Sequence, residues 1–269
     1  MKASKTATVK EEPKMDQNGY LKVVSYNVQC LSYGKEREKI VKILKDLDAD
    51  IIGLQELDIN TRRSGEGNQL QKLAEELGYE YCYAKTIFHQ GGAYGHGVMS
   101  KYPIRKTEVV YFDEKVAGCE DRAYSRTIIS VDGLKFSLYN VHITGGYGRI
   151  FEPLAEVNQV GKRMLLDPSA VLTGDFNLAP DMVKAGLPMA DFTLLNSPED
   201  PQLTTVNSAA PGEKATGVAY PIDNIVVRGP VEVKTLEDGK KLQVYGETGS
   251  DHYPVIAYIK FAEGYDYKY

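Results

Sequence analysis

Residues 171–177 read Val-Leu-Thr-Gly-Asp-Phe-Asn, an apolar strand that ends abruptly in a turn glycine, a carboxylate and an amide. By itself this ending is typical of an Asx turn. Other segments of the chain end in the same way, however, and strand ends are where protein scaffolds present catalytic groups. Their joint occurrence therefore predicts one shared site. The related segments are VVSYN (23–27), IIGLQE (51–56), LYNVH (138–142), IDNIV (222–226) and GSDHYP (249–254).

Strand-like and helix-like patterns alternate around these segments, which predicts an α/β fold of mixed sheets with helices outside. Apolar residues recur at helical spacing in the stretches 34–48, 68–77 and 152–166. The middle of the chain, 97–141, reads strand after strand with turn residues between, which favours antiparallel neighbours. Residues 178–220 form a long stretch rich in Pro, Asn and Ala. Further strands are expected at 21–28, 50–55, 170–173, 223–227 and 255–260.

The length of 269 residues allows one large domain or two small ones. Because the patterns alternate from Tyr20 onward without a linker, we expect a single catalytic domain over residues 19–269. Residues 1–18 are polar and charged, and we expect them to form a flexible leader. The leader lacks the apolar stretch of a signal peptide, yet it also resembles the tether that remains after a secretion signal is removed. The compartment stays open, a secreted or periplasmic location included.

Composition excludes several classes of protein. No run of 18 apolar residues is present, so we expect no transmembrane segment. The formal net charge of -5 gives no global support for a duplex binder, although a local basic cleft stays open. Cys30, Cys82 and Cys119 lack CxxC spacing and no HExxH occurs, which argues against a zinc site. Buried free thiols are favoured over a disulfide.

The polar groups at the strand ends suit phosphoryl chemistry at a metal ion. Mg²⁺ binds a few carboxylate or amide oxygens and keeps several waters, which leaves room for a phosphate oxygen. Glu56 and Asn27 offer oxygens of this kind. These two residues are therefore candidate ligands of a divalent cation.

A phosphoryl centre also needs a base that orients water and donors that hold the developing charge. Asp175 can be the base, with Asn177 and His252 as donors. An aspartate beside a catalytic histidine fixes its tautomer and favours the imidazolium. Either Asp223 or Asp251 could have this role for His252.

The chain resembles the endonuclease/exonuclease/phosphatase superfamily, which includes pancreatic DNase, abasic-site endonucleases, neutral sphingomyelinases and inositol polyphosphate 5-phosphatases. The resemblance extends from about residue 21 to 260. It implies a four-layer sandwich, in which two mixed β-sheets pack face to face and are flanked by helices. It also implies hydrolysis of a phosphoester by in-line attack of water, with Mg²⁺ as the metal and Mn²⁺ as a substitute. The motifs that carry it are YN (26–27), LQE (54–56), GDFN (174–177), ID (222–223) and SDH (250–252), in this order.

The resemblance also implies a role for each motif residue. His142 matches the histidine of the DNase, sphingomyelinase and phosphatase branches, whereas the abasic-endonuclease branch usually has tyrosine there, so His142 argues against that branch. The implied roles are Glu56 as the main metal ligand, Asn27 as its neighbour, Asp251 as a metal-side carboxylate, Asp175 as the residue that orients or deprotonates water, Asn177 as its partner on the phosphate, Asp223 as the support of the histidine, and His252 as the stabiliser of the transition state.

Other segments are similar to a bacterial-looking subgroup of small hydrolases in this superfamily. They are DINTRRSG (58–65), GGAYGHGVMS (91–100) and the pair Asp121-Arg122. Members usually have Asn where His96 stands, so we expect a structural or rim-lining part for His96. Arg122 is a candidate for bidentate binding of a substrate phosphate, ahead of Arg62 and Arg63. Tyr94 and Tyr147 could line the rim of the site or simply lie on the sheet surface.

We therefore expect a monomeric, metal-dependent phosphoester hydrolase, either a phosphodiesterase or a phosphatase. Its substrate could be a nucleic acid or the headgroup of a phospholipid or inositol phosphate, and the sequence does not choose between them. The alternative is a binding module that kept the fold and lost the chemistry. Such a module should have lost metal or base positions, and Glu56, Asp175 and His252 are all present.

Overall fold

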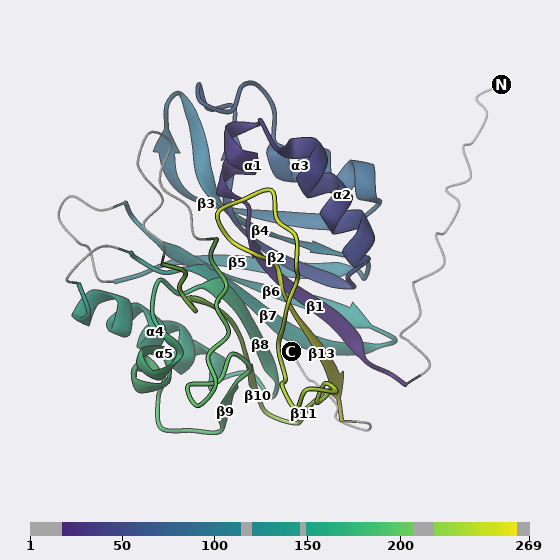
Figure 1. The fold of residues 1–269 in the computed structure, drawn as a ribbon, viewed down its shortest axis with the longest axis vertical. Helices are drawn as coiled ribbons and strands as arrows, with labels where there is room; N and C mark the ends of the chain where they lie inside the picture. The colour runs from purple at the N-terminus through teal and green to yellow at the C-terminus, as the bar shows by residue number, and fades with distance from the viewer. Residues whose placement is uncertain (1–17, 114–119, 146–148, 207–217, 263–269) are drawn as a thin grey trace.

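Two mixed β-sheets pack face to face at the centre of the computed structural model, which describes residues 18–113, 120–145, 149–206 and 218–262 (Figure 1). Cys119, Tyr147 and the expected leader up to residue 17 lie outside these ranges. The first sheet has the order β11-β13-β1-β2-β4-β3, with β12 paired to β13, and the second has the order β5-β6-β7-β8-β10-β9. The strands are β1 (Leu21–Asn27), β2 (Ile51–Ile59), β3 (Glu80–His89), β4 (Gly92–Ser100), β5 (Ile104–Tyr111), β6 (Ala123–Val131), β7 (Leu134–His142), β8 (Ala170–Asp175), β9 (Phe192–Leu194), β10 (Asp223–Arg228), β11 (Val231–Val233), β12 (Gln243–Val244) and β13 (Val255–Phe261).

Helices cover the outer face of each sheet, which confirms the expected four-layer α/β sandwich. α2 (Arg37–Leu47) and α3 (Gln69–Leu77) pack on the first sheet, and α4 (Phe151–Met164) and α5 (Pro180–Gly186) pack on the second. Each helix buries one apolar stripe, as the helical spacing predicts. None of the helices in the described ranges is long and apolar enough to cross a membrane.

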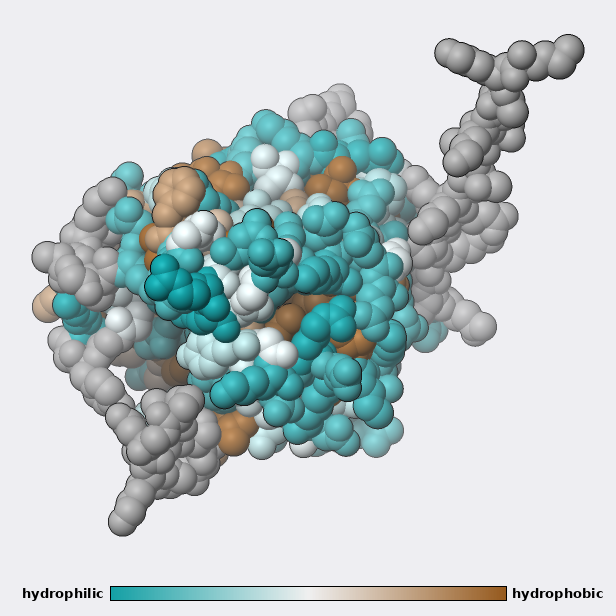
Figure 2. Space-filling view, turned by 90° about the horizontal axis from the view of Figure 1, so that it is seen from above, coloured by the Kyte–Doolittle hydropathy of each residue, from teal (hydrophilic) through white to brown (hydrophobic). Residues whose placement is uncertain are grey.

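The layers enclose separate hydrophobic cores. Successive residues of a strand point to opposite faces, so Val23 of β1 joins the core between the sheets and Val24 joins the core beneath α2 and α3. A third core lies between the second sheet and α4 with α5. Because these cores take up most apolar side chains, the face seen in Figure 2 is mostly hydrophilic, with hydrophobic residues in small separate patches.

Each sheet contains one parallel pair of strands, and both pairs end on the same side of the sandwich. β1 lies parallel to β2, with Asn27 beside Gln55, and β7 lies parallel to β8, with His142 beside Asp175. β13 and β10 flank these pairs in the antiparallel sense. The carboxyl ends of the parallel strands and the start of the antiparallel ones therefore meet at one end of the sandwich.

A buried polar clamp joins the two sheets just below those strand ends. From β7, the Asn140 amide donates to the carbonyl oxygens of Leu54 (3.0 Å) and Gly97 (2.9 Å) in the other sheet. Its carbonyl oxygen accepts from Gln55 (2.7 Å) and from the Thr173 hydroxyl (3.1 Å). These hydrogen bonds lie in the seam, the narrow space between the two sheets, and each donor in them has an acceptor. Because the bonds have fixed lengths, the clamp sets how closely the sheets approach.

The largest difference from the sequence expectation is α1 (Gln29–Tyr33), a turn of left-handed helix. All 5 of its residues have positive φ, between 45° and 58°, and none is glycine. Left-handed conformation costs roughly 1–2 kcal/mol for each such residue, so contacts from outside the turn must hold it. The turn ends at Gly34, whose φ of 84° suits glycine, and the right-handed helix expected from residue 34 begins only at Arg37.

Short elements were also missed. Residues 178–220 contain α5, which begins with Pro180 at its first position, and β9, and two short strands, β11 and β12, follow later. Elements of this length bury too few residues to show a periodic pattern. The antiparallel centre was predicted correctly, since β5, β6 and β7 pair antiparallel.

The closeness of the sheets predicts a large effect of one methyl group at Gly53. A Cβ at this position would lie 2.1 Å from the Thr173 hydroxyl and 2.8 Å from the Asn140 carbonyl oxygen. We expect Gly53→Ala to lower the free energy of unfolding by about 1–3 kcal/mol, measured by urea unfolding. Gly246→Ala is the control, because a Cβ there meets nothing within 4 Å. Equal stability of the two variants would contradict the packing described for the seam.

Candidate active site

Asn27, at the end of β1, is the centre of the candidate site. It is fully buried, and its side-chain nitrogen donates both to Glu56 Oε1 (3.0 Å) and to Asp175 Oδ2 (2.9 Å). Glu56 belongs to the first sheet and Asp175 to the second. A single amide therefore links carboxylates that come from different sheets.

A β-bulge aims Glu56 into the site. The register between β2 and β4 shifts between Leu54 and Leu57, and Glu56 has a φ of 56°. Left-handed backbone at a residue other than glycine costs on the order of 1–3 kcal/mol and is found preferentially at functional sites. The bulge interrupts the alternation of the strand and turns the carboxylate toward Asn27.

Glu56 and Asp251 form a pair of carboxylates that repel each other, and the positive charges of His252 and Arg122 act on Glu56 in the opposite sense. Burial raises the pKa of Glu56 above its ordinary value, and the negative charge of Asp251 adds to the rise. Neither carboxylate forms an ion pair with lysine or arginine in the described ranges. Two carboxylates and a nearby amide oxygen are the donor set that a hard divalent cation prefers. Glu56, Asp251 and Asn27 could therefore hold such an ion.

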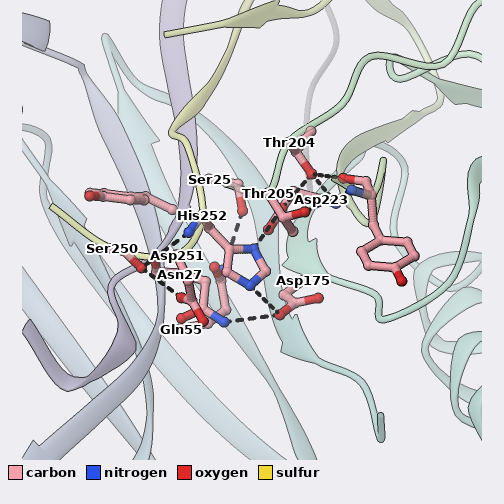
Figure 3. Close-up of polar contacts among 12 residues, drawn as sticks. Ser25, Asn27, Gln55, Asp175, Thr204, Thr205, Asp223, Ser250, Asp251 and His252 are labelled. Carbon is pink, nitrogen blue, oxygen red and sulfur yellow. Dashed lines mark hydrogen bonds and ion pairs between the residues drawn. The ribbon is translucent and has the colours of Figure 1, made fainter. Parts of the chain in front are cut away.

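His252 lies between two other carboxylates (Figure 3). Its Nδ1 is 2.8 Å from Asp223 Oδ2, and its Nε2 is 3.6 Å from Asp175 Oδ2. Burial alone would lower the pKa of His252, but the negative charges of Asp223 and Asp175 outweigh it and raise the pKa well above its ordinary value. His252 is therefore an imidazolium, and Asp223 rather than Asp251 is its hydrogen-bond partner.

Asp175 has the environment of a proton acceptor. Burial raises the pKa of Asp175 to about 7, although the positive charge of His252 opposes the rise. One of its oxygens accepts from the backbone N–H of Asn177 (2.9 Å), and the other from Asn27. A carboxylate whose pKa lies near neutrality can take a proton from water and release it again. The Asn177 side chain donates to the Ile143 carbonyl oxygen (3.0 Å), which fixes its position beside the site.

Arg122 and His142 form the opposite wall of the site. Arg122 Nη1 lies 2.9 Å from His142 Nδ1, and since a guanidinium can only donate, Nδ1 must accept. Burial lowers the pKa of His142 well below its ordinary value, and the positive charge of Arg122 adds to this effect. The neutral ring therefore carries its proton on Nε2, which faces Asp175 Oδ2 at 3.5 Å.

A second group of residues could be mistaken for the metal ligands. Asp175, Asp223 and His252 are buried, and their ligand atoms lie within 4.8 Å of one another. The Nδ1 of His252 already donates to Asp223, however, and the imidazolium neutralises charge that a cation would otherwise neutralise. The hydrogen-bond donors to Glu56 and Asp251 are instead neutral amides and a hydroxyl.

All the site residues expected from sequence belong to this one network, and several supporting residues were missed. The Thr204 hydroxyl donates to Asp223 Oδ2 (2.6 Å) and accepts from the Asp223 backbone N–H (3.1 Å). The Asn196 amide donates to the Asp223 carbonyl oxygen (3.1 Å). Both lie in the irregular stretch 178–220, where no sequence pattern distinguishes them. Gln29 was missed as well, and it contacts Asp251.

The structure also places the residues for which the sequence analysis gave alternative roles. Arg63 binds Asp58 through Nε (2.8 Å) and Nη2 (3.0 Å), so its guanidinium is already engaged, whereas Arg62 is exposed. Tyr94 is buried, so it does not line an open rim. His96 is fully buried, and burial lowers its pKa to about 3. Cys30 and Cys82 are free thiols, the first buried and the second partly so.

The sequence matches the model of the Endonuclease/Exonuclease/phosphatase family over residues 24–252. No curated protein matches it. An endonuclease/exonuclease/phosphatase family protein from Bacteroides thetaiotaomicron has 20% identity and a TM-score of 0.71, over 90% of this chain and 98% of that chain.

Two further solved structures have similar scores. A mannosyl-6-phosphatase from Bacteroides thetaiotaomicron VPI-5482 has 19% identity and a TM-score of 0.70, over 90% of this chain and 100% of that chain. TDP2 from D. rerio, in complex with a single-strand DNA product, has 18% identity and a TM-score of 0.69, over 90% and 99%. At such identities the likeness shows the fold.

The position of His252 predicts its titration. Because its pKa is raised in the folded state, the stability from this ion pair is fully present below about pH 6.5 and is lost as pH rises through the raised value. We expect Asp223→Asn to lower the pKa of His252. Burial would still disfavour the imidazolium, and one of the negative charges that favour it would be gone. Ring ¹⁵N shifts of the metal-free protein measure this, with the exposed Asp238→Asn as control. An imidazolium that persists unchanged in Asp223→Asn would contradict the assignment.

Proposed function

Because the chain belongs to the endonuclease/exonuclease/phosphatase family, we propose that it is a divalent-metal-dependent phosphoester hydrolase that uses Mg²⁺, with Mn²⁺ as a substitute. One observation carries the proposal: the Asn27 amide joins Glu56, on the proposed metal side of the site, to Asp175, on the side of His252. The proposed metal position and the proposed base position are therefore next to each other.

Glu56 and Asp251 are the proposed ligands of the cation, with Asn27 beside them. A divalent cation there would neutralise charge on a phosphoryl oxygen. Its own positive charge would also relieve the repulsion between Glu56 and Asp251. The fit of the residues to the ion thus rests on charge and on oxygen donors.

Asp175 is the proposed base. Its raised pKa lets it orient a water and accept its proton as the water attacks phosphorus. His252, held as an imidazolium by Asp223, donates to the phosphoryl oxygens as negative charge develops on them. Thr204 keeps Asp223 in place for this purpose.

His142, Asn177 and Arg122 complete the proposed set of donors. His142 presents an N–H toward Asp175, and Arg122 fixes this tautomer through its hydrogen bond to Nδ1. Donors already fixed by the fold need no reorganisation when charge develops, which is the main source of their effect. Arg122 contacts His142 in the wall of the site and is the proposed partner of a substrate phosphate.

The substrate is a phosphoester of a nucleic acid, a sugar, or a lipid or inositol headgroup. The single-strand DNA in the TDP2 structure supports the first class and the mannosyl-6-phosphatase supports the second. The net charge of -5 disfavours tight binding of a long polyanion, because each flanking phosphate requires a positive partner. We therefore place small phosphoesters and strand ends ahead of intact duplex DNA.

A panel of phosphoesters tests this proposal: plasmid DNA, RNA, sphingomyelin, inositol phosphates, sugar phosphates and an aryl phosphate, each with Mg²⁺, Mn²⁺ or EDTA. We expect hydrolysis with either metal and none with EDTA. Glu56→Gln removes a charged ligand and should raise the half-activating Mg²⁺ concentration by about 10-fold or more. Glu237→Gln makes the same change at an exposed residue outside the site. Metal-independent hydrolysis, or unchanged Mg²⁺ dependence in Glu56→Gln, would refute the metal assignment.

Loss of the base or of the imidazolium should act on the chemical step. We expect Asp175→Asn and His252→Ala each to lower kcat by about 10²-fold or more with little change in KM, because the lost stabilisation is present mainly in the transition state. Steady-state kinetics and a thermal melt are measured together. A destabilised but fully active His252→Ala protein would mean that Asp251-His252 is only a structural turn before β13.

A further inference from the structure

The left-handed turn α1 lies directly against the proposed metal ligands. Its first residue, Gln29, follows Asn27 by two positions and has a φ of 45°. The Gln29 backbone N–H donates to Asn27 Oδ1 (3.0 Å), and the Gln29 side-chain amide donates to Asp251 Oδ2 (2.8 Å). Asn27 and Asp251 are far apart in the sequence, and Gln29 is in contact with both.

The turn and the segment that carries Asp251 brace each other. The Ser32 hydroxyl of the turn donates to the Gly249 carbonyl oxygen (2.6 Å). From the other side, the Ser250 hydroxyl contacts the Asn27 carbonyl oxygen (2.7 Å) and Asp251 Oδ1 (3.1 Å). The handedness of a turn decides the direction in which each of its side chains points. The unfavourable left-handed backbone is therefore found together with the contact between Gln29 and Asp251.

The neutral side-chain amide of Gln29 is well suited to orient a carboxylate that binds a metal ion. A neutral amide fixes the orientation of a carboxylate without cancelling its charge, whereas lysine or arginine at the same place would compete with a cation. The negative charge of Asp251 still raises the pKa of Glu56, as expected if Gln29 orients the Asp251 carboxylate without neutralising it. Outer partners of this kind typically change metal affinity by about 10- to 100-fold when removed.

We propose that Gln29 is a positioning residue of the metal site, which holds Asp251 and Asn27 in the arrangement that binds the cation. The proposal rests on the proposed function, since it assumes that Asp251 and Asn27 face the metal. Gln29 acts through these residues and does not itself contact the substrate. The left-handed turn exists, on this view, to bring the Gln29 amide to Asp251.

Binding of Mn²⁺ to the metal-free full chain tests the proposal without an activity assay, through the loss of the free Mn²⁺ signal in electron paramagnetic resonance. Gln29→Met keeps the length of the side chain and removes the donor, and Gln29→Ala removes both. Gln71→Ala is the matched control, because the Gln71 amide also donates to a carboxylate, Glu75, at 2.8 Å, on the exposed face of α3. Thermal melts of the metal-free variants show whether each one folds.

We expect both Gln29 variants to fold and to bind Mn²⁺ about 10-fold or more weakly than the wild type and Gln71→Ala do. Wild-type affinity in a folded Gln29→Met protein would overturn the proposal while leaving the metal site intact. Failure of the wild type itself to bind Mn²⁺ would overturn the proposed metal site, and this inference with it. If Gln29→Ala does not fold, the comparison of Gln29→Met with Gln71→Ala decides the matter.

Discussion

The hydrogen bonds of Asn140 across the seam hold the two sheets at a fixed separation, and the position of every other group in the site depends on that separation. The amide reaches from β7 to backbone oxygens of β2 and β4, at a point where only glycine fits at residue 53. Side chains at the strand ends of one sheet can therefore hydrogen-bond to those of the other. The contact from Asn27 to Asp175 is possible only because the sheets are this close.

Carboxylates from both sheets lie close together in the site and repel one another. Their surroundings differ on the two sides of Asn27. On one side, His252 is an imidazolium between Asp223 and Asp175. On the other, Glu56 and Asp251 form no ion pair with lysine or arginine among the described residues, although the charges of His252 and Arg122 lower the pKa of Glu56. This asymmetry gives the two sides different chemistry, since the first can exchange protons and the second can bind a cation.

Sequence reasoning predicted the parts of this arrangement that are local. The strand that ends in Asp175 and the Asp251-His252 pair could be recognised because polar groups at the end of an apolar run are visible in the sequence. The hand of the turn at Gln29 and the bulge at Glu56 could not, because both conformations are intrinsically unfavourable and are held by tertiary contacts. Thr204 could not be predicted either, since only the fold brings its hydroxyl to Asp223. For the same reason residue types alone left open whether Asp223 or Asp251 pairs with His252, and only the family resemblance favoured Asp223.

We propose that the cation binds at Glu56 and Asp251 and not at the buried cluster around His252. Crystals soaked in Mn²⁺ test this most directly, because an anomalous difference map locates the metal without reference to activity. We expect a peak that is coordinated by Glu56 and Asp251 on the side of Asn27, with His252 Nδ1 still bonded to Asp223. A peak inside the cluster of Asp175, Asp223 and His252, with the histidine nitrogen as a ligand, would contradict it.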